Sequence, residues 1–451
     1  MKMACPGKDN VSLQEKNSTG RRSDFTLYKP ICYGIPTGAM KIPEILAPAG
    51  NMEALQTACL YGADAVYLGI RGDTNLRAGA RNFSLDELKE AVAYAHARGV
   101  RVYLTLNTYP HDEQLDSFSE IICAARDFSV DAIIVSDIGV LSLVRDLLAE
   151  GMPIHLSTQA NTVNIRAISA WETLGVTRVI LARELSHAEI AHIRANTSVE
   201  LELFVHGSVC ISISGRCLIS NYLCSRDANQ GACTQPCRWD YALVERTRPG
   251  EYMPLGEEDG YTFLYNSKDL CLLPVMDTVM GIGVEGLKIE GRNKTSLYIA
   301  TVVGVYRQAR DAYLKAPENY HIESEWKEEI KKISNRGYFM GFFMGKPDSG
   351  GIDYNFKGYS QSHHLAAKVI GLQDGRTVFE ARNPLIEGME LEWLSASGHR
   401  QNFTLADAQV QGMPQSRIRP GEVFAMKTPF SPVPGELIRK PFSEGDKVVF
   451  R

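Results

Sequence analysis

The stretch SLDELKEAVAYAHARGVRVYLTLN, residues 84–107, holds a complete helical pattern followed by a strand pattern. Ser84 stands three residues before Glu87, the spacing of a capping box at a helix start, and Gly99 is the residue type expected just past a helix end. The apolar run RVYLTLN (101–107) follows at once. A helix that leads directly into a short Val- and Leu-rich run is typical of a βα repeat and predicts a parallel sheet.

The same alternation recurs from Glu44 to Gly291, and Ser186 with Glu189 gives a second capping-box spacing. Eight short apolar runs are expected to be strands: 44–50, 65–69, 101–107, 131–137, 153–159, 178–184, 200–207 and 286–291. Eight strands in 248 residues match the length of about 250 typical of a (β/α)8 barrel, and a doubly wound sheet seldom needs eight such regular units. The sequence therefore predicts an α/β fold of the (β/α)8 TIM-barrel type.

The remaining segments differ in texture from the barrel. Residues 1–40 are polar and turn-rich, which predicts a poorly ordered extension before a barrel of residues 41–336. An insertion at 207–285, after the seventh strand, is far longer than an ordinary loop and is expected to be functional or a small subdomain. Residues 337–364 are a Gly- and aromatic-rich linker, and the short runs in 365–451 predict a small all-β domain.

Composition narrows the class of protein and its compartment. The 451 residues include 48 Lys and Arg against 53 Asp and Glu, so the net charge of −5 excludes a global basic field for nucleic acid. No apolar run approaches the roughly 20 residues of a membrane helix, and the first residues lack the apolar core of a secretory signal. We therefore expect a cytoplasmic protein without a membrane partner, whose clustered cysteines are metal ligands or catalytic groups rather than disulfides.

Five of the ten cysteines fall in CISISGRCLISNYLCSRDANQGACTQPC, residues 210–237, inside the insertion. Four have the spacing C-x6-C-x15-C-x3-C (Cys210, Cys217, Cys233 and Cys237), and Cys224 interrupts the longest gap. Four thiolates can hold an iron–sulfur cluster or a structural zinc, and buried cysteines can also act as small apolar groups. Zinc sites usually use two tight knuckles and only one pair is tight here, so the spacing favours a cluster.

Two stretches, ELFVHGSVCISISGRCLIS (202–220) and RDANQGACTQPCRW (226–239), together with LKIEGRNK (287–294), closely resemble the collagenase-like peptidase family of unsettled catalytic type. Within it, the chain is most similar to bacterial members that hydroxylate tRNA. The resemblance implies an enzyme that forms 5-hydroxyuridine at the wobble position of the tRNA anticodon, with prephenate, a small anionic metabolite, as co-substrate. It also implies a [4Fe-4S] cluster held by Cys210, Cys217, Cys233 and Cys237, with another residue type expected in relatives at Cys224.

Polar residues stand at the ends of several predicted strands, where a barrel turns them toward one mouth. They are Asn107, Gln159, Arg183, His206, Lys288, Glu290 and Arg292. Lys288, Glu290 and Arg292 alternate, so two cations flanking a carboxylate could hold a dicarboxylate, with internal salt bridges as the alternative. His206 and Glu290 are the candidates for acid–base catalysis, although a lone histidine such as His206 is as often a hydrogen-bond donor in a core.

Two other function classes stay open at this point: a metal-dependent peptidase acting on collagen-like chains, and a non-catalytic scaffold pinned by its cluster. The chain contains no H-E-x-x-H or G-x-S-x-G motif, which removes two common hydrolase signatures. For RNA, Arg216, Arg226 and Arg238 offer charge, and Tyr222 and Trp239 offer stacking surfaces. The alternative for these five residues is a solvated loop face with two aromatic rings packed beneath it.

Overall fold

The computed structural model describes residues 41–77, 80–148, 151–210, 212–213, 216–238, 242–244, 252–254, 268–346 and 360–442. The predicted extension 1–40 lies outside these residues, as do Trp239 and residues 347–359 of the predicted linker. Within the described part of the chain, no helix is long and apolar enough to cross a membrane. The predicted domain boundaries remain predictions.

Eight parallel strands form a closed barrel, which confirms the predicted fold. They are β1 (Glu44–Pro48), β2 (Ala65–Leu68), β3 (Arg101–Leu106), β4 (Ala132–Val135), β5 (Ile154–Leu156), β6 (Arg178–Ile180), β7 (Glu200–Ser208) and β11 (Gly286–Ile289). Neighbouring strands pair in chain order, and the pairing of β11 with both β1 and β7 closes the ring. Every strand begins inside a predicted apolar run, because a parallel strand covered on both faces must be apolar almost throughout.

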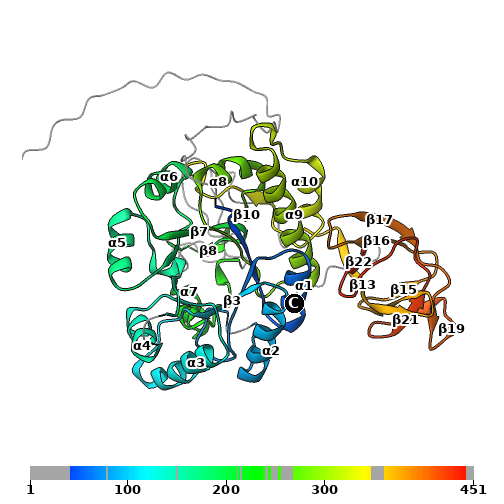
Figure 1. Ribbon diagram of the computed structural model, residues 1–451, viewed down its shortest axis with the longest axis horizontal. Coiled ribbons are helices and arrows are strands. Elements are labelled where there is room, and N and C mark those ends of the chain that lie inside the picture. The colour runs from blue at the N-terminus through cyan, green and yellow to red at the C-terminus, as the bar shows by residue number, and fades with distance from the viewer. Residues whose placement is uncertain are drawn as a thin grey trace, which may run out of the picture. The chain divides into compact units, whose positions relative to one another are not determined.

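Helices follow the strands and surround them (Figure 1). They are α1 (Met52–Leu60), α2 (Leu85–His96), α3 (Leu115–Asp127), α4 (Ile138–Leu148), α5 (Ile165–Thr173), α6 (His187–Ala195), α8 (Met276–Ile282) and α9 (Ser296–Lys315), with α10 (Ser324–Lys331) next along the chain. Both predicted capping boxes are present: the Ser84 hydroxyl accepts from the Glu87 amide at the start of α2, and Ser186 does so from Glu189 at the start of α6. These caps fix where the two helices begin.

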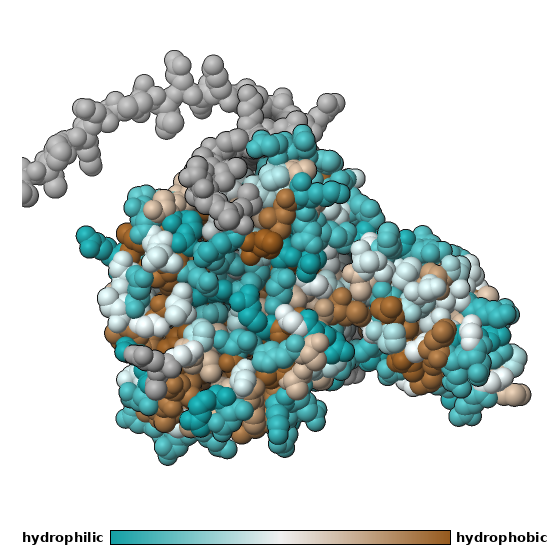
Figure 2. Space-filling view, in the orientation of Figure 1, coloured by the Kyte–Doolittle hydropathy of each residue, from teal (hydrophilic) through white to brown (hydrophobic). Residues whose placement is uncertain are grey.

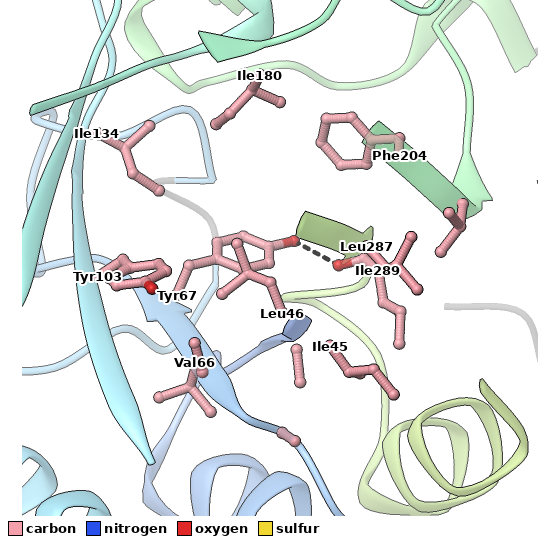
Figure 3. Close-up of a cluster of buried hydrophobic side chains, with 14 of the residues drawn as sticks. Ile45, Leu46, Val66, Tyr67, Tyr103, Ile134, Ile180, Phe204, Leu287 and Ile289 are labelled. Atoms are coloured by element: carbon pink, nitrogen blue, oxygen red, sulfur yellow. Dashed lines mark hydrogen bonds between the residues drawn. The ribbon is translucent and has the colours of Figure 1, made fainter. Parts of the chain in front are cut away.

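Side chains fill the inside of the barrel in layers. Tyr67, Ile134 and Ile180 point into the space enclosed by the strands, close to Phe204 (Figure 3). Together with Lys288 they come from alternate strands, β2, β4, β6 and β11, which is the layering expected of an eight-stranded barrel. The Tyr67 hydroxyl donates to the Ile289 carbonyl at 3.0 Å, which ties β2 to β11 across the interior.

The insertion after β7 begins as an extension of the barrel. The end of β7 pairs antiparallel with β10 (Asp269–Cys271), and β12 (Tyr338–Phe339) pairs with β10. Between β7 and β10 lie the short helix α7 (Ile219–Cys224), the 3-10 turns η4 (Ala228–Gln230) and η5 (Pro236–Arg238), and a hairpin of β8 (Ala242–Val244) and β9 (Tyr252–Pro254). The predicted cysteine-bearing insertion therefore has local structure of its own.

A separate antiparallel sheet follows the barrel, as the sequence predicts. Its eight strands are β13 (His363–Gln373), β14 (Arg376–Ala381), β16 (Glu390–Leu394), β17 (Arg400–Thr404), β18 (Gln409–Val410), β19 (Met413–Pro414), β21 (Val423–Met426) and β22 (Leu437–Pro441). A second pair is formed by β15 (Leu385–Ile386) and β20 (Arg417–Ile418). These strands enclose their own apolar core, which includes Phe379, Phe403 and Phe424.

Candidate active site at the barrel mouth

A cavity opens at the carboxyl ends of the barrel strands, where loops after the strands converge. Its empty space is about 1080 Å3, including the part open to solvent. The four cysteines Cys210, Cys217, Cys233 and Cys237 all line it. So do Asn107, Gln159, Arg183, Lys288, Glu290 and Arg292 from the predicted strand-end group. The cysteines of the insertion and the polar residues at the strand ends therefore meet at one place.

The four cysteines reach the cavity because the insertion folds back over the barrel mouth. Cys210 follows β7 directly, Cys217 precedes α7, and Cys233 and Cys237 lie around η5. The pKa of the Cys233 thiol is raised, chiefly by burial and also by the nearby Cys210 and Cys217, while the Gln235 amide that donates to its sulfur at 3.3 Å lowers the pKa. Three of the four thiols are thus near enough to influence one another's charge.

Four thiols around one cavity are a suitable donor set for a [4Fe-4S] cluster, which spreads its cysteines over several irons. Within the described residues, no three metal-ligating side chains converge tightly enough to hold a single ion. Four thiolates can also hold a structural zinc, so the chemistry of the donor set fits either group.

Cys224 does not line the cavity. It ends α7, and its sulfur accepts a hydrogen bond from the Thr234 hydroxyl at 3.5 Å. The same Thr234 lies 3.1 Å from the Ser220 hydroxyl, and its amide donates to that oxygen. Cys224 therefore helps to hold α7 against the segment that carries Cys233, while the other four thiols face the cavity.

Glu290 faces the cavity as an ionised carboxylate. Burial alone would raise its pKa, but the Arg77 guanidinium, which donates to Oε1 at 2.7 and 3.1 Å, lowers the pKa to about 2. A carboxylate with this pKa is a poor general acid at neutral pH and can act only as a base or as a fixed charge. A pKa of about 2 also makes Glu290 a weak base, so the carboxylate suits a fixed charge paired with Arg77 rather than acid–base catalysis.

We expect Arg77→Met to lower the free energy of unfolding at pH 7 by about 3 kcal/mol, because the variant leaves Glu290 buried without its partner. In the wild type, the contribution of Glu290 is full above about pH 4.5 and is lost as the pH falls toward 2, since its folded-state pKa is lowered. In the variant, burial raises the pKa of Glu290. The loss of unfolding free energy relative to wild type should therefore shrink as the pH falls from 8 to 5, as measured by urea denaturation. The double variant Arg77→Met with Glu290→Gln should recover most of the loss, and an unrecovered loss would contradict the pairing.

Arg292 follows β11 and is held in the cavity wall by several hydrogen bonds. Its Nη1 donates to the Thr105 hydroxyl at 2.8 Å, and its Nη2 donates to the Asn82 carbonyl oxygen at 2.8 Å and to Asn75. Burial lowers its pKa to about 10, so it stays a cation at neutral pH. These partners are neutral, which leaves the positive charge of Arg292 available to a ligand.

Lys288 lies at the floor of the cavity and already has a counter-ion. Its Nζ donates to the fully buried Glu202 at 2.8 Å. The same Nζ lies 4.3 Å from the centre of the Tyr67 ring. Burial lowers the pKa of Lys288, while Glu202 opposes this shift. The predicted trio is therefore divided: Lys288 and Glu290 belong to internal ion pairs, and Arg292 does not.

Arg183 enters the cavity from the loop after β6. Its guanidinium carbon lies 4.0 Å from the centre of the Phe204 ring, and its Nη1 donates to the Ser208 carbonyl at 3.0 Å. Its buried Nε has no hydrogen-bond partner among the described residues. A stacked guanidinium with a donor to spare is a suitable anchor for a carboxylate.

Asn107 and Gln159 form part of the opposite wall. The Asn107 amide nitrogen lies 3.4 Å from the Ser157 hydroxyl, and its Oδ1 accepts from the Leu76 amide. The Gln159 carbonyl accepts from Arg216 Nε at 2.9 Å and from the Tyr109 hydroxyl at 2.8 Å. These contacts join the barrel wall to Arg216 of the cysteine-bearing insertion.

His206 is not brought to the cavity. A β-bulge between β7 and β11 shifts the register, so Lys288 pairs with Phe204 but Ile289 pairs with His206. The extra residue turns the His206 ring away from the barrel interior, to within 5.2–5.9 Å of the Tyr298, Tyr306 and Tyr338 rings. Burial lowers its pKa to about 3, so the ring is neutral, and neither ring nitrogen has a hydrogen-bond partner in the described structure. Its position is that of a core residue rather than an acid–base catalyst.

Three cavity residues, Tyr67, Arg77 and Phe204, are not among the residues predicted from the sequence. Tyr67 and Phe204 lie inside predicted strands, so alternation along each strand could have placed them toward the interior. Arg77 lies in a loop well beyond the end of β2, and its approach to Glu290 depends on how that loop folds back. No sequence pattern marks this approach.

Comparison with known proteins gives the chain its family. Peptidase family U32 matches residues 50–353. The chain is 42% identical over 373 residues to tRNA hydroxylation protein P1 of Bacillus subtilis, covering 81% of this chain and 86% of that protein. It is 35% identical to tRNA hydroxylation protein P of Escherichia coli, covering 88% and 94% of the two chains. It is 33% identical to a protein named collagenase from Porphyromonas gingivalis, covering 67% and 74%. The chain belongs to peptidase family U32.

Proposed function

We propose that this protein is an RNA-modifying enzyme that hydroxylates the wobble uridine of tRNA to 5-hydroxyuridine, with an iron–sulfur cluster and with prephenate as co-substrate. The observation that carries the proposal is the meeting of four cysteine thiols with Arg183 and Arg292 around one cavity. The relatives named tRNA hydroxylation proteins support the RNA substrate. Their similarity extends over most of both chains, and the family match at residues 50–353 spans the cysteine-bearing insertion.

In this proposal Cys210, Cys217, Cys233 and Cys237 hold the cluster, which would supply redox chemistry beside the substrate. The chain's own residues bind and orient. Arg183 and Arg292 provide positive charge for the carboxylates of the co-substrate. Tyr67 and Phe204 form an apolar wall against which a ring can pack.

Replacing Arg183 with methionine tests the anion-binding role. The change keeps an unbranched apolar stem but removes the charged donor, so the co-substrate concentration for half-maximal rate should rise roughly 10- to 100-fold, as expected for loss of a charge-assisted hydrogen bond. Steady-state kinetics with prephenate varied at saturating tRNA measures this. Arg126→Met on the exposed face of α3 is the matched control. Equal co-substrate requirements in the two variants would remove Arg183 from the site.

A peptidase function finds less support in the geometry. Among the described residues that line the cavity there is no histidine, and Ser157 hydrogen-bonds Asn107 and the Gln159 amide. A serine nucleophile needs an adjacent base to be activated. The relative named collagenase therefore shares the family with this chain, and no serine–histidine pair among the described cavity residues matches the name.

The decisive assay incubates anaerobically purified protein with tRNA that lacks the modification and with prephenate, followed by digestion to nucleosides and mass spectrometry. The proposal predicts 5-hydroxyuridine that depends on both protein and prephenate. Gelatin is incubated in parallel. If wild type forms no hydroxylated nucleoside but cleaves gelatin, and Cys233→Ser does not cleave it, the protein is a peptidase instead. Absence of both activities would favour a scaffold.

A further inference from the structure

Large apolar side chains are exposed on the insertion that carries the cysteines. Ile213, Leu218, Tyr222 and Leu223 are 65%, 69%, 89% and 48% exposed. Leu218 and Tyr222 are four residues apart, and the Tyr222 amide donates to the Leu218 carbonyl, so their side chains share one face of α7. We call these four residues, with the exposed Arg226, the insertion face.

Exposed apolar groups elsewhere in the described barrel also gather near the mouth. Ile138, at 58% exposed, follows β4, and Val163, at 41%, follows β5. Among the exposed large apolar residues of the described barrel, Ile42 is the exception, because it lies before the first strand rather than after a strand. On the side drawn in Figure 2, hydrophobic residues form separate patches within a mainly hydrophilic surface. Ile138 and Val163 therefore follow the carboxyl ends of barrel strands, on the side of the barrel where the cavity opens.

The insertion face and the cavity wall are built on the same packed elements. Leu218 directly follows the cavity residue Cys217, and α7 packs against η4 and η5, whose residues Ala228, Pro236 and Cys237 line the cavity. The Thr234 hydroxyl binds Cys224 on the side of α7 that faces this segment. A ligand bound on the insertion face would therefore be held at a fixed position relative to the cavity.

The charge of the insertion is complementary to a polyanion such as RNA. Residues 208–238 contain three arginines and one aspartate, in a chain whose net charge is −5. Asp227 is occupied in accepting from the Asn229 amide at 2.8 Å. An exposed tyrosine with apolar neighbours and nearby arginine is the combination on which unpaired bases stack while phosphates are neutralised.

We propose that the insertion face binds a single-stranded RNA segment, with Tyr222 stacking on an unpaired base next to the one presented to the cavity. This inference rests on the proposed RNA-modifying function and assigns the surface that receives the substrate. Arg226 contributes to a phosphate, and Leu218 supports the stacked base. Double-stranded RNA lacks the splayed bases that this face would bind.

Binding of a fluorescent hairpin RNA with a uridine-containing loop, measured by anisotropy on the full-length protein, tests the proposal. Tyr222→Ala should weaken binding about 5- to 150-fold, the range for loss of one base–aromatic stack, whereas Tyr222→Phe should bind within about 3-fold of wild type. Arg226→Ala should weaken binding and reduce the salt dependence by about one counterion. Ile386→Ala, at an apolar surface site of the C-terminal sheet domain that is 41% exposed, is the control and should not change RNA binding.

Wild-type affinity in both Tyr222→Ala and Arg226→Ala would overturn the proposal. The proposal would also fail if Tyr222→Ala bound RNA as wild type does but changed the self-association of the protein in sedimentation. The insertion face would then bind a second copy of the chain. The nucleoside assay separates this from the proposed function. If wild type forms 5-hydroxyuridine and Tyr222→Ala needs no more tRNA, only the surface assignment fails; if wild type forms none yet RNA binding depends on Tyr222, only the reaction fails.

Discussion

Replacement of Cys233 with serine is expected to reduce formation of 5-hydroxyuridine by more than about 100-fold, since loss of a ligand should exceed the 10- to 100-fold effects of outer-shell changes at metal sites. Cys233 lines the cavity with three other cysteines, and its sulfur is within the electrostatic influence of two of them, Cys210 and Cys217. A serine hydroxyl keeps the shape but is not a thiolate donor. Product is measured by nucleoside mass spectrometry, with circular dichroism to confirm that the variant is folded.

Cys224→Ser is the matched control, because Cys224 lies in the same insertion but outside the cavity lining. A serine there can still accept from Thr234, so the variant should keep most of its activity and all of its iron. If Cys224→Ser loses product as fully as Cys233→Ser, the ligand set read from the cavity is incorrect. If Cys233→Ser stays active, the cavity does not need its fourth thiol.

Gly207→Ala is expected to destabilise the protein by about 2–5 kcal/mol, combining backbone strain with overpacking. Gly207 has φ +111°, and an added Cβ would lie 2.6 Å from the Glu290 carbonyl oxygen and 2.8 Å from the Glu290 Cβ. The strain therefore falls on the residue whose carboxylate faces the cavity, so activity should fall together with stability. Urea denaturation and the nucleoside assay measure the two effects.

Gly281→Ala provides the comparison, because a Cβ at Gly281 in α8 meets nothing within 4 Å and its φ is not in the left-handed region. Alanine is favoured over glycine inside a helix, so this variant should be as stable as wild type or more stable by up to about 1 kcal/mol. A Gly207→Ala protein as stable as Gly281→Ala would contradict the close approach of β7 to Glu290.

The barrel could be predicted from the sequence because its signals are local. Each parallel strand is a continuous apolar run, and the capping boxes at Ser84 and Ser186 mark helix starts independently of the rest of the chain. The strand-end residues Asn107, Gln159 and Arg183 could likewise be placed at the mouth, because all parallel strands end at one edge. These inferences need only the order of residues along single segments.

The parts that the sequence could not predict depend on contacts between segments. Alternation along β7 would put His206 on the side of Phe204, but the bulge opposite Ile289 reverses it. Arg77 reaches Glu290 only through the fold of its loop. The spacing of the cysteines did not show which one faces away from the cavity, because the direction of Cys224 is set by α7 and by its contact with Thr234.

The central claim is that the four cavity cysteines hold an iron–sulfur cluster beside the substrate, and metal analysis of the anaerobically purified full-length protein tests it most directly. The account predicts about four iron atoms and about four acid-labile sulfides per chain, as expected of a [4Fe-4S] centre on four thiolates. Both should be lost in Cys233→Ser and kept in Cys224→Ser. Stoichiometric zinc with no iron would contradict the claim.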